Sequence, residues 1–188
     1  MKYSTFFVAV IFLSLLSLFS CENPATEGSQ SDTENPFFVR DPNHIYFKNV
    51  RSYYYTESLA PGGKPSERMN VYQLRKFTDT KERPLIYPKI IDNWIEDEAY
   101  LFLEGNDYPM AIPLTLFVAE GRDTSIIRME RPTPEVQWAT AQKITEALEA
   151  ERSLFILNEA REREPIFEQK TDRLAFLTTI KDFRRLTE

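Results

Sequence analysis

Short runs of apolar and aromatic residues alternate with polar ones through the first half of the chain, as in half-buried strands. Residues 45–59 and 69–77 are rich in Tyr, Phe and Val. Residues 60–66 between them contain Pro and Gly, which favour tight turns. This arrangement predicts a β-hairpin.

Four further runs have the composition of strands: 86–94, 99–104, 114–119 and 124–130. Pro88 lies within the first of them. Because proline donates no hydrogen bond to a neighbouring strand, we expect this run at a sheet edge or a bulge. The last two runs flank Glu120-Gly121-Arg122-Asp123, which predicts a second hairpin.

The second half of the chain changes to the three- and four-residue spacing of helices. Thr133 is a favoured N-cap, Pro134 suits the first helical position, and Glu135 interacts favourably with the helix dipole. One apolar stripe follows at helical spacing: Trp138, Ala141, Ile144 and Leu148. These features predict a helix that begins after Thr133.

The end of the chain predicts a short apolar element and a closing helix. Residues 153–158 suit a buried strand, although a continued helix is the alternative. The closing helix is expected to begin near Thr171 or Asp172. Its apolar side carries Phe176, Leu177, Ile180 and Phe183. Runs of strands followed by helices indicate an α+β fold, with a largely antiparallel sheet from the first half packed with two helices from the second half.

The amino terminus has a different pattern. Lys2 precedes the apolar residues 6–19, which only Ser14 and Ser17 interrupt. Fourteen helical residues rise about 21 Å, less than the ~30 Å hydrocarbon core of a bilayer. This length favours the apolar region of a secretory signal over a lasting transmembrane anchor.

The apolar run ends in Leu18-Phe19-Ser20-Cys21, which resembles the lipobox of bacterial lipoprotein precursors. In that family a Leu, two smaller residues and a Cys mark the cleavage site, and Phe19 is larger than the residue usual there. The resemblance implies removal of residues 1–20 as a signal peptide and attachment of a diacylglycerol thioether to Cys21. It covers only the targeting segment. A conventionally cleaved signal and an uncleaved anchor are the alternatives.

The residues after the lipobox predict a tether. Residues 22–36 are polar, acidic or turn-forming, with Ala25 as the only apolar residue. Such a segment buries too little surface to become ordered, so residues 21–36 are interpreted as a lipidated Cys and a flexible linker. Fully stretched, the linker reaches about 50 Å. Phe37-Phe38-Val39 marks the expected start of a single globular domain, residues 37–188.

The composition limits the chemistry of this domain. The chain has 188 residues with 23 basic and 29 acidic side chains, a net charge of −6. An acidic chain with no basic run longer than two residues argues against a nucleic-acid partner. One histidine and one cysteine cannot form a Cys/His metal site or an internal disulfide. We therefore expect no cofactor and no bound metal.

Acidic side chains are frequent in one stretch: Asp92, Glu96, Asp97, Glu98, Glu104 and Asp107. The favoured interpretation is a solvated turn. The alternatives are a calcium site and a pair of carboxylates that hydrolyse a glycoside. His44 is interpreted as a surface or strand-entry residue, because no G-x-S-x-G nucleophile accompanies it.

Tyrosine is concentrated in the same half of the chain, where eight of the nine tyrosines lie between residues 46 and 108. Neighbouring residues of a strand face opposite ways, so Tyr53 and Tyr55 should share a face that Tyr54 does not. Tyr54 and Tyr72 are the candidates for a binding face on the open side of the sheet. The favoured interpretation for most of the rings is that they pack between strands, with one exposed pair as the alternative.

These observations predict a lipid-anchored cell-envelope protein, attached to a membrane on the periplasmic or outer surface. It is expected to be a non-enzymatic binding or scaffold component with a protein or glycan partner. The alternative is an envelope polysaccharide hydrolase that uses carboxylates of residues 92–107.

Overall fold

The computed structural model describes residues 35–60, 69–77, 83–106, 113–158 and 161–188. The lipobox-like segment, Cys21 and most of the linker lie outside these residues. Asn35–Glu188 form one compact unit. No helix within the described ranges has the length and hydropathy to cross a membrane.

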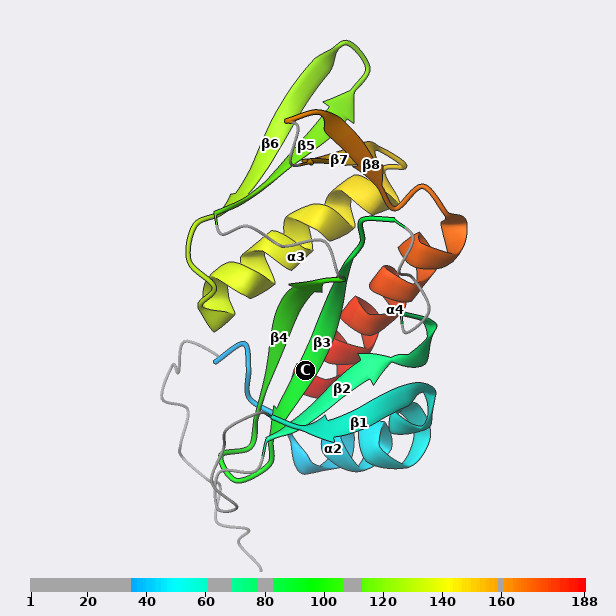
Figure 1. Ribbon diagram of the computed structural model, residues 1–188. Coiled ribbons are helices and arrows are strands. Elements are labelled where there is room, and N and C mark those ends of the chain that lie inside the picture. Colours follow the sequence, from blue (N-terminus) through cyan, green and yellow to red (C-terminus); the bar gives the residue numbers. More distant parts are fainter. Residues whose placement is uncertain (1–34, 61–68, 78–82, 107–112, 159–160) are drawn as a thin grey trace, which may run out of the picture. The chain divides into compact units, whose positions relative to one another are not determined.

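The first sheet contains four antiparallel strands in the order β1-β2-β3-β4 (Figure 1). Their bounds are Tyr55–Leu59, Asn70–Leu74, Ile86–Asn93 and Glu98–Gly105. The first hairpin was predicted between residues 45–59 and 69–77, and its strands β1 and β2 pair from Tyr55 opposite Leu74 to Leu59 opposite Asn70.

Pro88 lies in β3, an inner strand, so the expectation of an edge strand is wrong for the strand as a whole. The pairing of β2 with β3 ends where Gln73 lies opposite Lys89, the residue that follows Pro88 in the chain. Pro88 is therefore paired with β4 alone, where it lies opposite Leu103. The strand is locally at an edge where proline cannot donate a hydrogen bond.

A second antiparallel sheet has the order β6-β5-β7-β8. Its strands span Leu114–Glu120 (β5), Asp123–Met129 (β6), Ser153–Leu157 (β7) and Arg163–Ile166 (β8). The predicted second hairpin is confirmed, and Gly121 in its turn has φ +63°, a conformation that favours glycine. The strand at 153–158 is also confirmed, whereas β8 was not predicted, because its sequence Arg-Glu-Pro-Ile lacks an apolar alternation.

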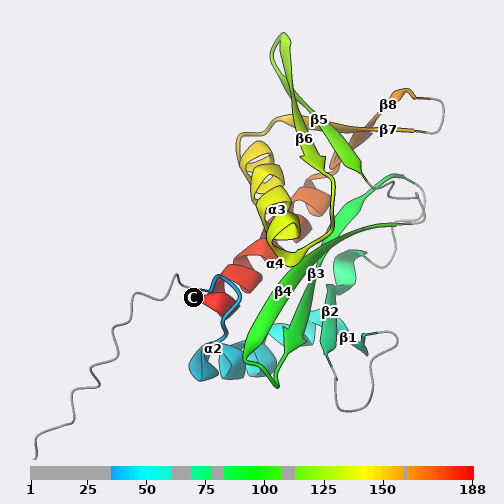
Figure 2. The same cartoon turned by 90° about the vertical axis from the view of Figure 1, so that its left-hand side faces the viewer.

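The two predicted helices are α3, Pro134–Glu149, and α4, Lys170–Thr187. The Thr133 side chain accepts a hydrogen bond from the backbone N–H of Val136 at 3.5 Å, as expected of an N-cap. Figure 2 shows both helices on one face of the first sheet, where α3 packs against β4 and α4 against β3. The α+β class is confirmed, with the strands divided between two sheets.

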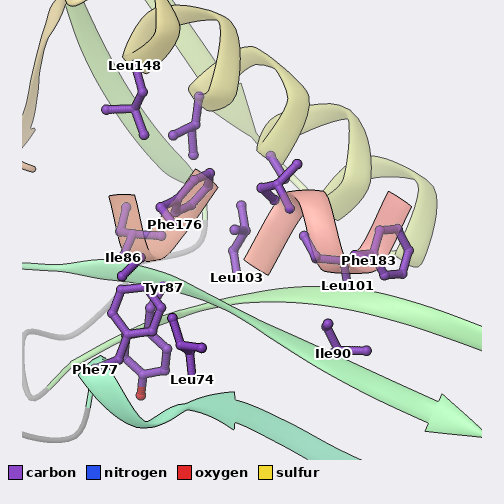
Figure 3. Packing of buried hydrophobic residues seen from close by; sticks show 14 of the residues in the cluster. Leu74, Phe77, Ile86, Tyr87, Ile90, Leu101, Leu103, Leu148, Phe176 and Phe183 are labelled. Carbon is purple, nitrogen blue, oxygen red and sulfur yellow. The ribbon is translucent and has the colours of Figure 1, made fainter. Parts of the chain in front are cut away.

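The core fills the space between these helices and the first sheet (Figure 3). Ile86, Leu103, Phe176 and Phe183 are buried there. The buried Gln137 of α3 accepts a hydrogen bond from the backbone N–H of Leu103 at 2.9 Å, which covers part of the exposed edge of β4. Phe37 and Val39 also join the core, at the point where the folded domain was expected to begin.

Residues 45–54 are helical, so the prediction of a strand across 45–59 is wrong for its first ten residues. The helical segment consists of α2, Asp41–Tyr46, a π-helical turn η2, Phe47–Arg51, and a 3-10 turn η3, Ser52–Tyr54. Pro42 in the first turn and the acidic Asp41 favour the helix start. We call residues 41–54 the entry segment.

Candidate functional site

A pocket of about 310 Å³ lies beside the end of the entry segment. It brings together the entry segment, the end of β2, the 3-10 turn η4 (Arg75–Phe77) and the middle of α4. The residues that line it are Arg51, Tyr53, Tyr54, Leu74, Arg75, Lys76, Ala175 and Thr178. We call it the tyrosine pocket.

Two tyrosine rings form an exposed wall of the tyrosine pocket. Tyr53 is 73% exposed and Tyr54 is 52% exposed. Their rings meet edge to face, with centroids 5.8 Å apart and planes at 84°. This is a favourable aromatic geometry, which stabilises the observed arrangement of the two rings. The exposure expected for Tyr54 is confirmed.

Each ring also contacts a guanidinium. The Arg75 guanidinium carbon lies 5.5 Å from the centroid of the Tyr53 ring, and that of Arg51 lies 4.9 Å from the centroid of the Tyr54 ring. Both distances are within the range of cation–π attraction. The four side chains therefore form one chain of contacts along the pocket wall.

Arg51 is fixed by a buried carboxylate of α4. Its Nε and a terminal nitrogen donate hydrogen bonds to the two carboxylate oxygens of Asp182, both at 2.8 Å. The Tyr55 hydroxyl donates to the same carboxylate at 2.7 Å. The hydrogen bond to Asp182 raises the pKa of Arg51, and burial, with Asp182, raises the pKa of Tyr55. The wall of the tyrosine pocket is thus anchored to the core of the fold.

Basic side chains are frequent among the described lining residues of the tyrosine pocket. Of the eight described residues that line it, three are basic and none is acidic. Asp182 pairs with Arg51 from behind the wall. Arg75 and Lys76 are exposed at the rim, and Arg75 Nε donates to the carbonyl oxygen of Tyr55 at 3.2 Å. Of the three cations, Arg51 is therefore already paired, and Arg75 and Lys76 lie at the exposed rim.

Tyr72 does not share a face with Tyr54, so its predicted place on an open binding face is wrong. It is 0% exposed, and its position in the register opposite Ile90 places it on the face of the sheet that the helices cover. Its ring packs against Phe47 and Tyr55. The alternating-face rule did not apply to Tyr54, because that residue precedes the strand in a 3-10 turn.

A second polar cluster fastens the entry segment to the sheet. His44 Nε2 lies 3.0 Å from a carboxylate oxygen of the buried Asp92. Lys48 Nζ lies 3.7 Å from that oxygen and 3.5 Å from Glu57 Oε1. The Tyr72 hydroxyl donates to Glu57 at 3.0 Å and also contacts Lys48. Burial and the bond to Glu57 raise the pKa of Tyr72.

This cluster differs from a catalytic triad in one respect. Among the described contacts of His44, no serine, threonine or cysteine is hydrogen-bonded to its ring. His44 and Asp92 join α2 to β3, a pairing of residues 48 positions apart that no local pattern indicates. Asp92 is buried, so the interpretation of a solvated turn is wrong at that residue.

Three other acidic residues of the 92–107 stretch, Glu96, Glu98 and Glu104, have separate partners. Glu96 accepts a hydrogen bond from Asn93, and Glu104 pairs with Lys89. Glu98 contacts Asn35 and Tyr100; burial, with that contact, raises the pKa of Tyr100 to about 12. Asp107 lies outside the described residues. Within the described ranges, no group of three or more His, Cys, Asp or Glu side chains is placed to hold a metal ion.

The sequence reasoning identified Tyr54 and missed the rest of the tyrosine pocket. The cations Arg51, Arg75 and Lys76 carried no motif, and α4 supplies Ala175 and Thr178 from about 100 residues further along the chain. Comparison with known proteins adds no relative: no family model, no curated protein and no solved structure matches this chain.

Proposed function

We propose that this chain is a lipid-anchored cell-envelope protein that binds a partner non-enzymatically through the tyrosine pocket. The proposal of partner binding is carried by the exposed pair Tyr53 and Tyr54, whose rings contact each other and the guanidinium groups of Arg75 and Arg51.

Exposed rings of this kind suit recognition. A tyrosine combines a large apolar surface with a polar tip, and tyrosine and arginine are enriched among residues that dominate binding energy. Rings whose positions are favoured by existing contacts lose less conformational freedom when a partner covers them. The anchored Arg51 provides that preorganisation for Tyr54.

The anchor half of the proposal rests on the resemblance of residues 18–21 to a lipobox. Two or more acyl chains at Cys21 would hold the protein stably at a membrane, because each buried CH₂ contributes about 0.8 kcal/mol. Asn35 and Pro36 belong to the compact unit, so the linker before it has 13 residues, 22–34. Fully stretched it would reach about 45 Å and let the binding unit search a volume near that membrane.

Cys21→Ser is expected to abolish lipidation, because serine offers no thiol for the thioether. Metabolic labelling with a fatty-acid analogue should mark the wild-type chain and leave the Cys21→Ser chain unlabelled as a longer precursor. Thr33→Ser, in the same linker, serves as the control and should keep the label. Undiminished label in Cys21→Ser would contradict lipid attachment at Cys21.

Partner binding through the tyrosine pocket is tested separately, by cross-linking from position 54 in the native envelope.

The hydrolase alternative gains no specific support from the geometry. Asp92 is engaged by His44 and Lys48, and Glu104 by Lys89. A glycosidase needs two carboxyl groups that flank the scissile bond about 5–10 Å apart. The binding function is therefore the one we carry forward.

A further inference from the structure

Exposed apolar side chains gather at the end of the first sheet where β3 turns into β4. Five of the eleven large apolar side chains that are exposed among the described residues belong to this end, and each is between 48% and 59% exposed. They are Phe38, Ile45, Leu59, Trp94 and Ile95. We call these five residues the turn patch. Single exposed apolar residues are ordinary on a protein surface, whereas a group of them at one end indicates a contact.

The strand register brings β1 to this end of the sheet. Leu59 is opposite Asn70 of β2, and Asn70 is opposite Asp92 of β3. β3 ends one residue later, and the turn of residues 94–97 follows. The end of β1 and the β3–β4 turn therefore lie at the same end of the first sheet.

The segment before β1 reaches the same place. Phe38 forms an isolated bridge with Glu98, the first residue of β4. The contact of His44 with Asp92 holds α2, which carries Ile45, beside the end of β3. Figures 1 and 2 both show α2 near this end of the first sheet, away from the second sheet.

The amino-terminal residues are attached to the compact unit beside this turn. The unit begins at Asn35, whose side-chain amide donates a hydrogen bond to Glu98 at 2.7 Å. The backbone N–H of Val39 donates to the carbonyl oxygen of Asp97 at 2.7 Å, and that of Ala99 donates to the carbonyl oxygen of Phe37 at 2.8 Å. The attachment point of residues 1–34 is therefore held next to the turn patch.

We propose that the turn patch lies on the surface of the bilayer to which the chain is tethered, with Trp94 and Ile95 between the lipid headgroups and the acyl chains. This inference rests on the anchor in the proposed function, and it adds the orientation of the folded unit. An indole suits this depth, because its ring is apolar and its N–H can remain among polar headgroups. Ile95 and Phe38 would add buried apolar area, on which interfacial binding depends.

A weak contact is sufficient here because the chain is tethered. The predicted linker, residues 22–34, reaches at most about 45 Å. A short linker makes the second contact intramolecular, with an effective concentration in the millimolar range. A contact that would be negligible for a free protein is then well populated.

The acidic residues of the turn indicate the kind of bilayer. Glu96 and Asp97 are exposed beside Trp94 and Ile95. Anionic headgroups would repel both carboxylates. The surface that matches the turn patch is therefore one of zwitterionic lipid, such as phosphatidylcholine.

This orientation leaves the tyrosine pocket accessible. β2 begins at Asn70, near the turn patch, and ends at Leu74, which lines the pocket. The turn patch and the tyrosine pocket therefore lie at opposite ends of this strand. A partner could reach Tyr53 and Tyr54 while the turn patch contacts the membrane.

Quenching of tryptophan fluorescence by brominated lipid tests this contact. The chain has two tryptophans, and the second, Trp138, is half-buried on α3, where its ring centroid lies 5.0 Å from that of Phe183. The full-length chain, purified from the envelope, is reconstituted in phosphatidylcholine vesicles with or without brominated acyl chains, and flotation shows that it is attached. Trp138→Phe, which reports Trp94 alone, should lose about half of its emission to the brominated lipid, and Trp94→Phe less than about a tenth.

Two matched substitutions link the quenching to the turn patch. Ile95→Asp and Ile126→Asp exchange the same residue types at side chains that are 50% and 58% exposed. In the Trp138→Phe background, Ile95→Asp should reduce the quenching of Trp94 about twofold or more, because a carboxylate disfavours insertion into the interface. Ile126→Asp, in the second sheet, should leave the quenching unchanged.

The outcomes separate this inference from the proposed function. Flotation of the chain without quenching of Trp94 would overturn the membrane contact and leave the anchor standing. Equal quenching of Trp94 and Trp138, or equal effects of the two Asp variants, would also overturn it, since neither fits a fixed orientation. Failure of the chain to float would contradict both the anchor and the membrane contact. Partner binding fails separately, when position 54 contacts no partner in the envelope.

Discussion

Asp182→Ala is expected to lower the free energy of unfolding by about 3–5 kcal/mol, the largest effect we predict for a polar residue. The buried carboxylate accepts two hydrogen bonds from Arg51 and one from Tyr55. Its removal leaves a partly buried guanidinium and a buried hydroxyl without their acceptor, which costs more than the net value of the pair.

Denaturant unfolding of the purified chain measures this loss. Asp123→Ala provides the control, because Asp123 is exposed at the β5–β6 turn and should change stability by no more than about 0.5 kcal/mol. Arg51→Met in the Asp182→Ala background removes the unpaired charge, so part of the stability should return. A loss below about 1 kcal/mol in Asp182→Ala would show that the entry segment is not anchored by this pair.

Tyr72→Ser is expected to destabilise the chain by about 3–5 kcal/mol, because it removes a ring that is completely buried against Phe47 and Tyr55. The substitution also removes the contacts that the Tyr72 hydroxyl makes with Glu57 and Lys48. A thermal melt that matches the wild type would contradict the burial of this ring.

Tyr54→Ser is the matched comparison for Tyr72→Ser, since both variants exchange the same two residue types. Tyr54 is half exposed, so its replacement should change stability by only about 0.5 kcal/mol. The two tyrosines were equivalent candidates in the sequence. Their expected difference in stability follows from the structure alone.

The elements that the sequence predicted well are those whose signals are local. Thr133-Pro134-Glu135 marks the start of α3, and the apolar spacing from Phe176 to Phe183 marks the buried side of α4. The turn at Gly121 needs a positive φ, which is also a local requirement. Such signals do not depend on the rest of the fold.

The entry segment was mispredicted because its composition and its conformation disagree. Its tyrosines, phenylalanine and valine are typical of strands, yet Phe47 packs into the core from a helical turn. Tertiary packing here outweighs intrinsic propensity, since a buried aromatic ring contributes more than the small preference of a residue for a strand.

The tyrosine pocket could not be predicted as a site, because its parts meet only through tertiary structure. Arg51 and Asp182 are 131 residues apart in the sequence, and neither belongs to a motif. A concentration of tyrosines indicated that some rings could bind a partner. Which rings are exposed depends on where β1 begins, and that boundary was the one misplaced.

Photo-cross-linking from position 54 tests the central claim most directly. Benzoylphenylalanine in place of Tyr54 in the full-length chain, irradiated in the native envelope, places the reactive group at the wall of the tyrosine pocket. The control is the same residue in place of Ile126, which is 58% exposed on β6 of the second sheet. We predict a discrete adduct of higher mass from position 54 and none from position 126. Equal adducts from both positions, or none from position 54, would contradict binding through the tyrosine pocket.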